Sequence, residues 1–361
     1  MPNLRTCRAQ QRSTNRSSGS TVSTAEGSHG RTSPRRPSLD PASGAIRNAV
    51  RAGLAAAGAS DPGVIVAVSG GADSMALLHA TAFLHRRGEI RARAVTVDHG
   101  LQTVTAEVAA RVAAAAESWG MPAEVMPVSI DAGEEGLEAA ARTARYAALE
   151  TARTAAGADW ILTAHTRRDQ AETVLLGLMR GSGTRSLAGM SPLTGHLMRP
   201  LLGLDRDQTE ASCRAQGVEV WNDPMNADTA FTRIRARRLL AGVEAELGQP
   251  ITANLARTAD LCRADADFID ARAEAEGQRI RGVASVPVEI FTALDDAVFS
   301  RVVREWVVSL GVPGQNLGAV RVAELCALIR DRARGRLSLP GDTEVVVSDG
   351  QAVFRTAAKA R

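Results

Sequence analysis

The sequence predicts an α/β protein in which a parallel sheet covered by helices is followed by a smaller, mainly helical C-terminal domain. Short apolar runs alternate with helical patterns between residues 46 and 240, an order typical of parallel sheets with helices on both faces. Beyond this region, Leu255, Cys262 and Ile269 recur every seventh residue, as on the apolar face of a long helix. The final segment, 337–354, alternates apolar and polar residues, which indicates short strands.

Residues 1–42 precede this pattern and differ from it in composition. They contain eight Ser, five Thr and seven Arg with almost no apolar residues, so they cannot bury enough surface to fold. We therefore expect a disordered tail at 1–42, a catalytic domain at 43–240 and a C-terminal domain at 241–361. With two acidic residues the tail carries +5, which leaves −2 for the rest of the chain.

The elements follow in a regular order along the catalytic domain. β-branched and other apolar residues predict strands at 64–68, 92–97, 123–128 and 160–163. Helical patterns lie between them at 74–87, 105–119 and 137–156, and again in the C-terminal domain at 294–310 and 317–333. Ligands of such sheets bind at the carboxyl ends of the strands, where Ser69, Asp98 and His165 are expected to converge.

The segment that follows the first strand carries the clearest chemical signal. Its residues are Ser69, Gly70, Gly71, Ala72, Asp73 and Ser74, and a helical pattern begins after them. Glycines allow a tight turn and close approach of a ligand, and the free amides of a helix N-terminus attract anions. A carboxylate among phosphates indicates a bridging Mg²⁺, which we assign to Asp73.

Two further strand ends carry polar residues. Val97 and Asp98 end the second strand, where a nucleotide site and an ordinary turn closed by Gly100 fit the pattern equally well. The fourth strand delivers His165, and a helix begins near Arg168 with Asp169 and Glu172 in its first turns. Acidic residues there also serve as helix caps and complement the helix dipole. This role is sufficient to explain Glu172, but it does not explain His165 together with the rest of the segment 162–176.

A helix before the fourth strand carries a charged face. Glu138, Arg142 and Arg145 share this face by their spacing of three and four residues. Spacing alone favours a solvated, salt-bridged surface over a binding site.

The cysteines and the apolar segments narrow the protein class. Cys7, Cys213, Cys262 and Cys326 form no C-x-x-C pair, which argues against a zinc site, an iron–sulfur cluster and a secreted disulfide framework. No run approaches the about 20 apolar residues that span a bilayer. We expect a cytoplasmic protein without a membrane partner.

The order of the motifs resembles that of the tRNA(Ile)-lysidine synthetases, within the PP-loop (N-type) ATP pyrophosphatase superfamily. The resemblance covers residues 60–240, through S-G-G-x-D-S from Ser69, V-D-H-G-L from Val97, E-A-A-A-R-x-x-R-Y from Glu138, H-x-x-x-D-Q-A-E-T from His165 and R-G-S-G from Arg180. Further matches are L-A-G-M from Leu187, R-P-L-L from Arg199, W-N-D-P-M-N from Trp221 and F-T-R-I-R-A-R from Phe231.

The resemblance implies an ATP-dependent ligase that modifies tRNA. Such enzymes adenylate the C2 oxygen of the wobble cytidine in a tRNA with a CAU anticodon, and lysine then displaces AMP to give lysidine. The implied cofactors are ATP and Mg²⁺, and the implied partners are tRNA(Ile) and L-lysine. Homodimer formation is compatible with these features, and the sequence does not decide the oligomeric state.

The resemblance also implies roles for individual residues. Catalysis falls to Asp73, Asp169 and His165, with the two aspartates as metal ligands or, alternatively, as partners of the lysine amine. ATP binding falls to residues 69–74 with Val97 and Asp98. The substrate contacts are Glu138, Arg142, Arg145, Glu172, Arg199, Arg233 and Arg237. Ser182 and Gly183 belong to a loop expected to close over the site, and Tyr146 and Phe231 are the candidates for base stacking.

Three residues depart from the family pattern and leave alternatives open. Arg168 stands where an Asp is usual, Gln102 replaces a frequent Arg, and Ile234 replaces a frequent Asn. These changes bear on RNA contacts more than on the type of reaction. The alternatives are a tRNA thiolase, an amide-forming ligase of the same superfamily and, outside enzymes, an ATP-sensing RNA-binding module.

Overall fold

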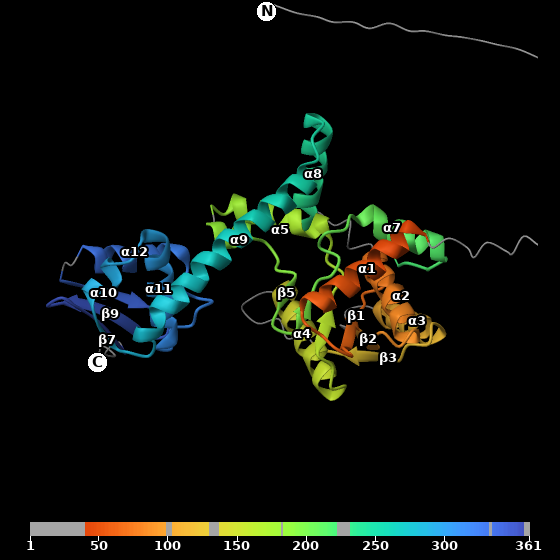
Figure 1. The fold of residues 1–361 in the computed structure, drawn as a ribbon, viewed down its shortest axis with the longest axis horizontal. Helices are drawn as coiled ribbons and strands as arrows, with labels where there is room; N and C mark the ends of the chain where they lie inside the picture. The colour runs from red at the N-terminus through yellow and green to blue at the C-terminus, as the bar shows by residue number, and fades with distance from the viewer. Residues whose placement is uncertain are drawn as a thin grey trace, which may run out of the picture. The chain divides into compact units, whose positions relative to one another are not determined.

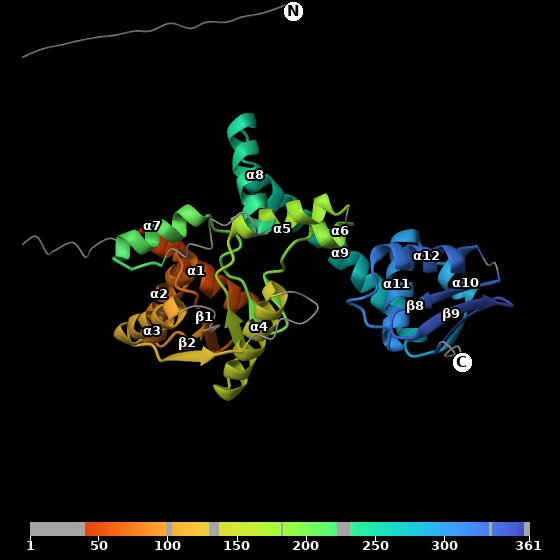
Figure 2. The same ribbon diagram turned by 180° about the vertical axis from the view of Figure 1, so that it is seen from behind.

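The computed structural model describes residues 40–98, 103–129, 137–181, 183–221, 232–331 and 334–356. The predicted α/β fold class is confirmed, and Figures 1 and 2 show its elements from two opposite sides. The catalytic part contains α1 (Pro41–Ala56), β1 (Gly63–Ala67), α2 (Ala72–Arg86), β2 (Arg91–Asp98), α3 (Thr103–Ser118), β3 (Ala123–Pro127), α4 (Leu137–Ala155), β4 (Trp160–Leu162), α5 (Arg167–Met179), α6 (Thr184–Leu187), β5 (Leu193–Thr194), β6 (Leu197–Met198), α7 (Arg206–Gln216) and α8 (Thr232–Leu247).

Helix α1 begins two residues before the expected boundary at residue 43. The helix starts at Pro41, and the carboxylate of Asp40 accepts hydrogen bonds from the backbone N–H of Ser43 at 2.8 Å and from its hydroxyl at 3.0 Å. Proline suits the first turn because it has no N–H to satisfy there. Residues 1–39 lie outside the described part of the chain.

The main sheet has the order β3-β2-β1-β4-β6-β5, and all neighbouring pairs are parallel except the β5–β6 hairpin. Alternation along β1 decides which helices cover which face. Val64 and Val66 join a core formed with α1, α2 and α3, whereas Ile65 joins a second core with Leu149 of α4. Both faces are covered, so the free carboxyl ends of the strands form the open edge available to a ligand.

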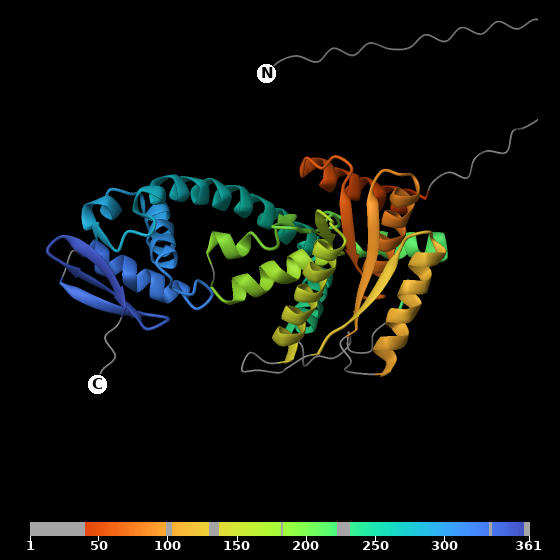
Figure 3. The same cartoon turned by 90° about the horizontal axis from the view of Figure 1, so that it is seen from below.

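Helix α9 (Ile251–Gly277) is a single helix of 27 residues that contacts two groups of elements (Figure 3). It packs against α5, α6 and α8 of the catalytic part and against α11 of the C-terminal part. Small residues on one face, Ala259, Ala266 and Ala273, are almost fully buried, which allows close packing. The long helix expected from the heptad spacing is confirmed.

The C-terminal part combines helices with a small antiparallel sheet of order β7-β10-β9-β8. Its core contains Phe291, Trp306 and Leu325, which are almost fully buried. The elements are η2 (Gln278–Ile280), β7 (Ser285–Pro287), α10 (Val288–Thr292), α11 (Asp296–Ser309), α12 (Ala319–Arg330), β8 (Gly335–Leu339), β9 (Thr343–Ser348) and β10 (Gln351–Thr356). Among the described residues, no helix combines the length and the apolar character needed to cross a membrane.

Candidate active site

The glycine-rich turn between β1 and α2 depends on Gly70. Its φ of +86° lies in the left-handed region, and a Cβ there would lie 2.8 Å from Cγ1 of Val108. Both the backbone and the packing therefore require glycine at this position. Gly71 has a φ of −72° as the N-cap of α2, so the expectation that both glycines serve the turn is correct only for Gly70.

The hydroxyl of Ser74 folds the turn back on itself. It donates to the carbonyl of Gly71 at 2.9 Å and accepts from the backbone N–H of Ser69 at 3.2 Å. The amide of Ser69 is thus hydrogen-bonded within the turn, and the predicted ATP-binding role of Ser69 stays a prediction. Because Gly71 has no side chain to cap α2, the amides of the first turn, from Ala72 onward, form an uncapped helix N-terminus that suits an anion.

Asp73 lies in this first turn with its side chain 21 % exposed. Its Oδ1 accepts a hydrogen bond from the hydroxyl of Thr209 at 2.5 Å, and its Oδ2 lies 3.8 Å from Nη1 of Arg206. Burial raises the pKa of Asp73, the contacts with Thr209 and Arg206 lower it, and the negative charge of Asp169 raises it again. The charges of the two predicted metal ligands, Asp73 and Asp169, therefore act on each other.

Asp169 occupies the third position of α5 and completes its N-terminal cap. Its Oδ2 accepts hydrogen bonds from the backbone N–H of Thr166 at 2.7 Å and from the Thr166 hydroxyl at 2.9 Å. This is one half of a capping box. Asp169 therefore has the capping contact that the sequence suggested for Glu172, and this contact orients the Asp169 carboxylate.

Glu172 faces inward, with 2 % of its residue surface exposed. Its Oε1 lies 2.6 Å from Nε of Arg237 and 3.9 Å from Nε of Arg168. Burial raises the pKa of Glu172, while the Arg237 partner lowers it. The structure therefore pairs two residues that were expected to contact substrate, and their pairing joins α5 to α8.

His165 lies at the strand end as predicted, and its Nδ1 is 3.0 Å from the hydroxyl of Thr163. Burial lowers the pKa of His165 to about 4, Asp169 acts in the opposite direction, and the positive charges of Arg199, Arg142 and Arg145 lower it further. The imidazole is therefore neutral at pH 7 and serves as a hydrogen-bonding group rather than a cation.

Four arginines form what we call the arginine cluster: Arg142, Arg145, Arg199 and Arg233. Burial lowers the pKa of Arg145, and the like charges of Arg142 and Arg233 lower it further. Within the described residues, no carboxylate lies within ion-pair distance of any of the four. Arg142 and Arg145 also lie over the ring of Tyr146, at 4.9 and 5.5 Å from its centroid, which stabilises cations only modestly.

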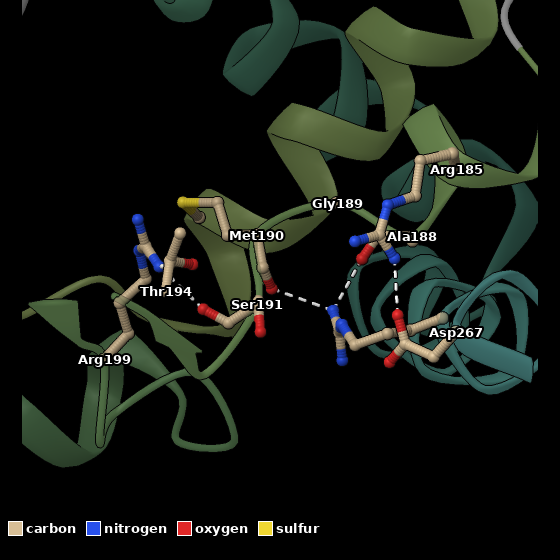
Figure 4. Close-up of a pocket in the computed structure, with 9 residues that line it drawn as sticks. Arg185, Ala188, Gly189, Met190, Ser191, Thr194, Arg199 and Asp267 are labelled. Atoms are coloured by element: carbon tan, nitrogen blue, oxygen red, sulfur yellow. Dashed lines mark hydrogen bonds and ion pairs between the residues drawn. The ribbon is translucent and has the colours of Figure 1, made fainter. Parts of the chain in front are cut away.

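Arg199 is the most enclosed member of the arginine cluster, at 8 % exposure. Its Nη1 donates to the carbonyl of Ser191 at 2.7 Å and lies 3.2 Å from the hydroxyl of Thr194, whereas its buried Nε has no partner among the described residues. Arg199 lines a cavity of about 330 Å³ together with Met190 and Arg185 (Figure 4). A buried guanidinium held only by neutral groups leaves its charge available to an anion.

The cavity wall is tied to α5 and α9. The side chain of Gln170 accepts from the N–H of Met190 at 2.8 Å and donates to its carbonyl at 3.0 Å. Arg263 of α9 donates to the carbonyls of Met190 and Ala188. Gly189, with a φ of +61°, lets the chain pass Gln170 closely, because a Cβ would lie 2.6 Å from its Oε1. Gln170 thus has a structural role beside Asp169.

The remaining predicted residues are described only in part. Val97 and Asp98 end β2 opposite Met126 and Pro127 of β3, and the hydroxyl of Thr105 donates to Oδ1 of Asp98 at 2.7 Å. Gly183 caps the N-terminus of α6. The side chain of Glu138 and the whole of Gly100, Gln102, Ser182 and Phe231 lie outside the described residues.

The carboxylates of Asp73 and Asp169 fit a magnesium ion that is shared with phosphates. Mg²⁺ usually takes one or two protein carboxylates together with substrate phosphates and water. The described residues contain no group of three or more His, Cys, Asp or Glu side chains able to form a cage made of protein alone. The two aspartates, next to an uncapped helix N-terminus, match the donor set for a metal bound with a nucleotide.

Comparison with known proteins agrees with this geometry. Residues 46–243 match the model of a PP-loop domain family, and residues 287–353 match the TilS substrate binding domain. The tRNA(Ile)-lysidine synthase of Thermobifida fusca is 44 % identical over 85 % of this chain and 96 % of its own length. The chain belongs to the tRNA(Ile)-lysidine synthase family. Those of Streptomyces coelicolor and Salinispora tropica are 43 % and 44 % identical, over 81 % and 87 % of this chain and 85 % and 96 % of their own lengths.

The residues that contact Asp73 in this lysidine synthase homologue lie outside the motifs that it shares with its family. Thr209 and Arg206 belong to α7, a helix between two of the motifs. One local signal marks the start of α7, since Asp205 and Gln208 form a capping box. Nothing in the sequence pattern links Thr209 to Asp73, 136 residues earlier.

Proposed function

We propose that this protein ligates lysine to C2 of the wobble cytidine of tRNA(Ile) with a CAU anticodon, using ATP and forming lysidine. The observation that carries the proposal is the combination of three features: the uncapped N-terminus of α2, the interacting carboxylates of Asp73 and Asp169, and the arginine cluster, of which Arg199 is buried. An ATP site next to an unneutralised cationic surface is what the adenylation of an RNA requires. The similarity to lysidine synthases over most of the chain selects this reaction within the superfamily.

The first step is adenylation of the tRNA. The C2 oxygen of the cytidine attacks the α-phosphorus of ATP, a new P–O bond forms, and the bond to the β-phosphate oxygen breaks to release pyrophosphate. The amides of the first turn of α2 hold the phosphates. Mg²⁺, held by Asp73 and Asp169, would neutralise charge that develops on the phosphates. Neutral His165 is placed to donate a hydrogen bond without adding to the positive charge.

The second step is displacement of AMP by lysine. The ε-amine of lysine attacks C2, the C–N bond forms, the C–O bond to AMP breaks, and the amine loses a proton. Asp169 has Oδ2 engaged by Thr166, so its other oxygen is the candidate for orienting the amine or the metal. Lysidine then pairs with A instead of G, as the family implies.

Binding of tRNA is assigned to two surfaces. The arginine cluster is proposed to hold the RNA phosphates near the wobble base, because phosphate contacts by arginine fix register and orientation. Residues 241–361 are proposed to add a second contact surface, in agreement with the substrate binding domain model matched at 287–353. The catalytic role is assigned to residues 43–240.

The cysteines do not favour the thiolase alternative. Burial raises the pKa of Cys213 and of Cys326 to about 11, so both thiols are protonated at neutral pH. A nucleophilic cysteine needs the opposite shift, because the thiolate is the reactive form. The third described cysteine, Cys262, has no cysteine partner.

Mass spectrometry of tRNA nucleosides tests the proposed function. The protein is incubated with ATP, Mg²⁺, lysine and an unmodified tRNA(Ile) transcript, and a cytidine carrying lysine at the wobble position is expected. Without lysine, pyrophosphate release and an adenylated tRNA are expected. An elongator methionine tRNA with the same anticodon serves as the specificity control. An unmodified wobble cytidine after complete incubation would refute the proposal.

The setting of the reaction is proposed to be the cytoplasm, where ATP, lysine and tRNA are available together. A homodimer is the assembly to be tested, by light scattering of the purified protein with and without tRNA. A mass equal to a single chain under both conditions would exclude it.

A further inference from the structure

We propose that α7 is a positioning element for the reaction and that Thr209 and Arg206 hold the carboxylate of Asp73 in its working orientation. This inference rests on the proposed function, because it assigns Asp73 to the reacting phosphates. Neither residue belongs to a motif of the catalytic domain. Both act through Asp73 and are positioning residues rather than catalytic ones.

Thr209 is the stronger of the two contacts. It is fully buried, and its hydroxyl oxygen lies 2.5 Å from Oδ1 of Asp73 and 2.7 Å from the carbonyl oxygen of Arg206. Its single hydrogen is shared between two acceptors, and the charged carboxylate is the stronger one. The contact with the carbonyl fixes the rotamer of Thr209, so its oxygen stays aimed at Asp73.

Arg206 approaches the other carboxylate oxygen. Its Nε donates to Glu210 one turn later at 2.9 Å, and its Nη1 lies 3.8 Å from Oδ2 of Asp73. Glu210 thereby orients the guanidinium, and the charge of Arg206 lowers the pKa of Asp73. The two oxygens of Asp73 are thus approached from one helix, which restricts rotation of the carboxylate.

Helix α7 is itself held against the elements that carry both aspartates. The thiol of Cys213 lies 3.4 Å from the carbonyl of Ala72, next to Asp73, and the hydroxyls of Ser212 and Ser43 lie 2.8 Å apart. Arg167, at the start of α5, lies 2.6 Å from the carboxylate of Asp205 at the N-cap of α7. The helix therefore connects the turn bearing Asp73 with the helix bearing Asp169.

Removing the hydroxyl of Thr209 tests the inference with little change in shape. In Thr209→Val the carboxylate gains freedom to rotate, and we expect kcat for pyrophosphate release to fall by about 10- to 100-fold, as for a misplaced catalytic group. The affinity for ATP without Mg²⁺ should stay within about twofold, because the α2 amides are intact. The gain in ATP affinity on adding Mg²⁺ should shrink by about 10-fold.

Two further variants make the result specific. Thr209→Ser keeps the hydroxyl and should restore kcat to within about threefold of the unchanged protein, because the bond to Asp73 persists. Thr81→Val is the matched control, since Thr81 is also fully buried and, among the described residues, its hydroxyl bonds to the carbonyl of Leu77 at 2.7 Å and to no carboxylate. It should leave kcat and the Mg²⁺ effect unchanged while lowering the melting temperature.

Full kcat and an unchanged Mg²⁺ effect in Thr209→Val would overturn the inference. An equal loss in Thr209→Val and Thr209→Ser would overturn it as well. If Thr209→Val does not fold, Arg206→Gln is measured instead. A kcat and an Mg²⁺ effect equal to those of the unchanged protein would then contradict the positioning role of α7. Calorimetric ATP binding needs no tRNA, so the inference can survive or fail even if lysidine is not formed.

Discussion

The arginines of the C-terminal part and those of the arginine cluster differ in whether a carboxylate pairs with them. In the C-terminal part several of them form ion pairs, as in Arg330 with Asp296 at 2.7 Å, Arg334 with Asp349 at 2.5 Å and Arg355 with Glu344 at 2.9 Å. In the arginine cluster, two helices, α4 and α8, and the segment after β6 supply four guanidiniums without a carboxylate partner among the described residues.

The difference separates a solvated surface from a binding site. Exposed ion pairs contribute little to stability and little net charge, and residues 287–353 contain nine acidic residues against seven arginines. Partly buried like charges oppose folding, so they are expected where an anionic ligand neutralises them. We therefore expect the strongest phosphate contacts in the catalytic part.

The largest effect is expected from the carboxylate of the ATP site. Asp73→Asn should lower pyrophosphate release by about 1,000-fold or more, because a metal ligand and its charge are lost together. Asp349→Asn removes a carboxylate from an exposed pair and should leave the rate unchanged. Both variants are compared by initial rates at saturating Mg²⁺ and by circular dichroism. A folded Asp73→Asn protein with normal rates would remove Asp73 from the metal site.

Ion pairs of the two regions should also differ in their effect on stability. Glu172→Gln leaves Arg237 half-buried without its partner and should lower the free energy of unfolding by about 3 kcal/mol. Glu344→Gln breaks a pair whose arginine is 56 % exposed and should cost at most about 1 kcal/mol. Urea unfolding at pH 7 measures both. Equal losses would show that burial does not separate the two regions.

The pH dependence of stability reports the burial of His165 and, to a smaller extent, its cationic surroundings. The pKa of about 4 in the folded protein lies below the ordinary value of about 6.5, so the unfolded chain binds more protons between these values. Stability is therefore complete above about pH 6.5 and falls as the pH drops towards 4, by at most about 1.4 kcal/mol per pH unit for this group. The difference in unfolding free energy between pH 7 and pH 5 should be smaller in His165→Asn. An unchanged difference would contradict the assigned pKa.

Substitution of one arginine in each region should affect the affinity for tRNA differently. Arg145→Gln should weaken tRNA binding by about 10-fold. It should also reduce the slope of log affinity against log salt concentration by about one, as for one lost phosphate contact. Arg334→Gln should change the affinity by less than about twofold, because Asp349 already neutralises this charge. Filter binding at several salt concentrations measures both. A larger effect for Arg334 than for Arg145 would reverse the comparison.

The smallest effect is expected at the N-terminus. Deletion of residues 1–39 should leave stability and modification unchanged, whereas deletion of 1–42 also removes Asp40 and the first turn of α1. Loss of an N-cap costs about 1 kcal/mol, so the shorter protein should melt a few degrees lower. Differential scanning calorimetry compares the two deletions. Identical melting temperatures would show that the Asp40 cap contributes nothing.

The sequence by itself determined the local elements and their order. The strand predicted at 64–68 is β1 at Gly63–Ala67, and the helices predicted at 294–310 and 317–333 are α11 and α12, within three residues at each end. Periodicity and glycine placement are encoded by neighbouring residues, so a short window contains the necessary information. The glycine-rich turn and the convergence of three strand ends follow from the same local patterns and the parallel order of the strands.

Only the tertiary structure decided which charged groups meet. Capping was expected to explain Glu172, yet Asp169 caps α5, whereas Glu172 is buried with Arg237. The bond from Thr209 to Asp73 spans 136 residues. A charge can be paired, capped or left for a ligand with the same local sequence, because its partner comes from a distant segment and is selected by packing. Folding therefore decides which carboxylates and guanidiniums remain available for chemistry.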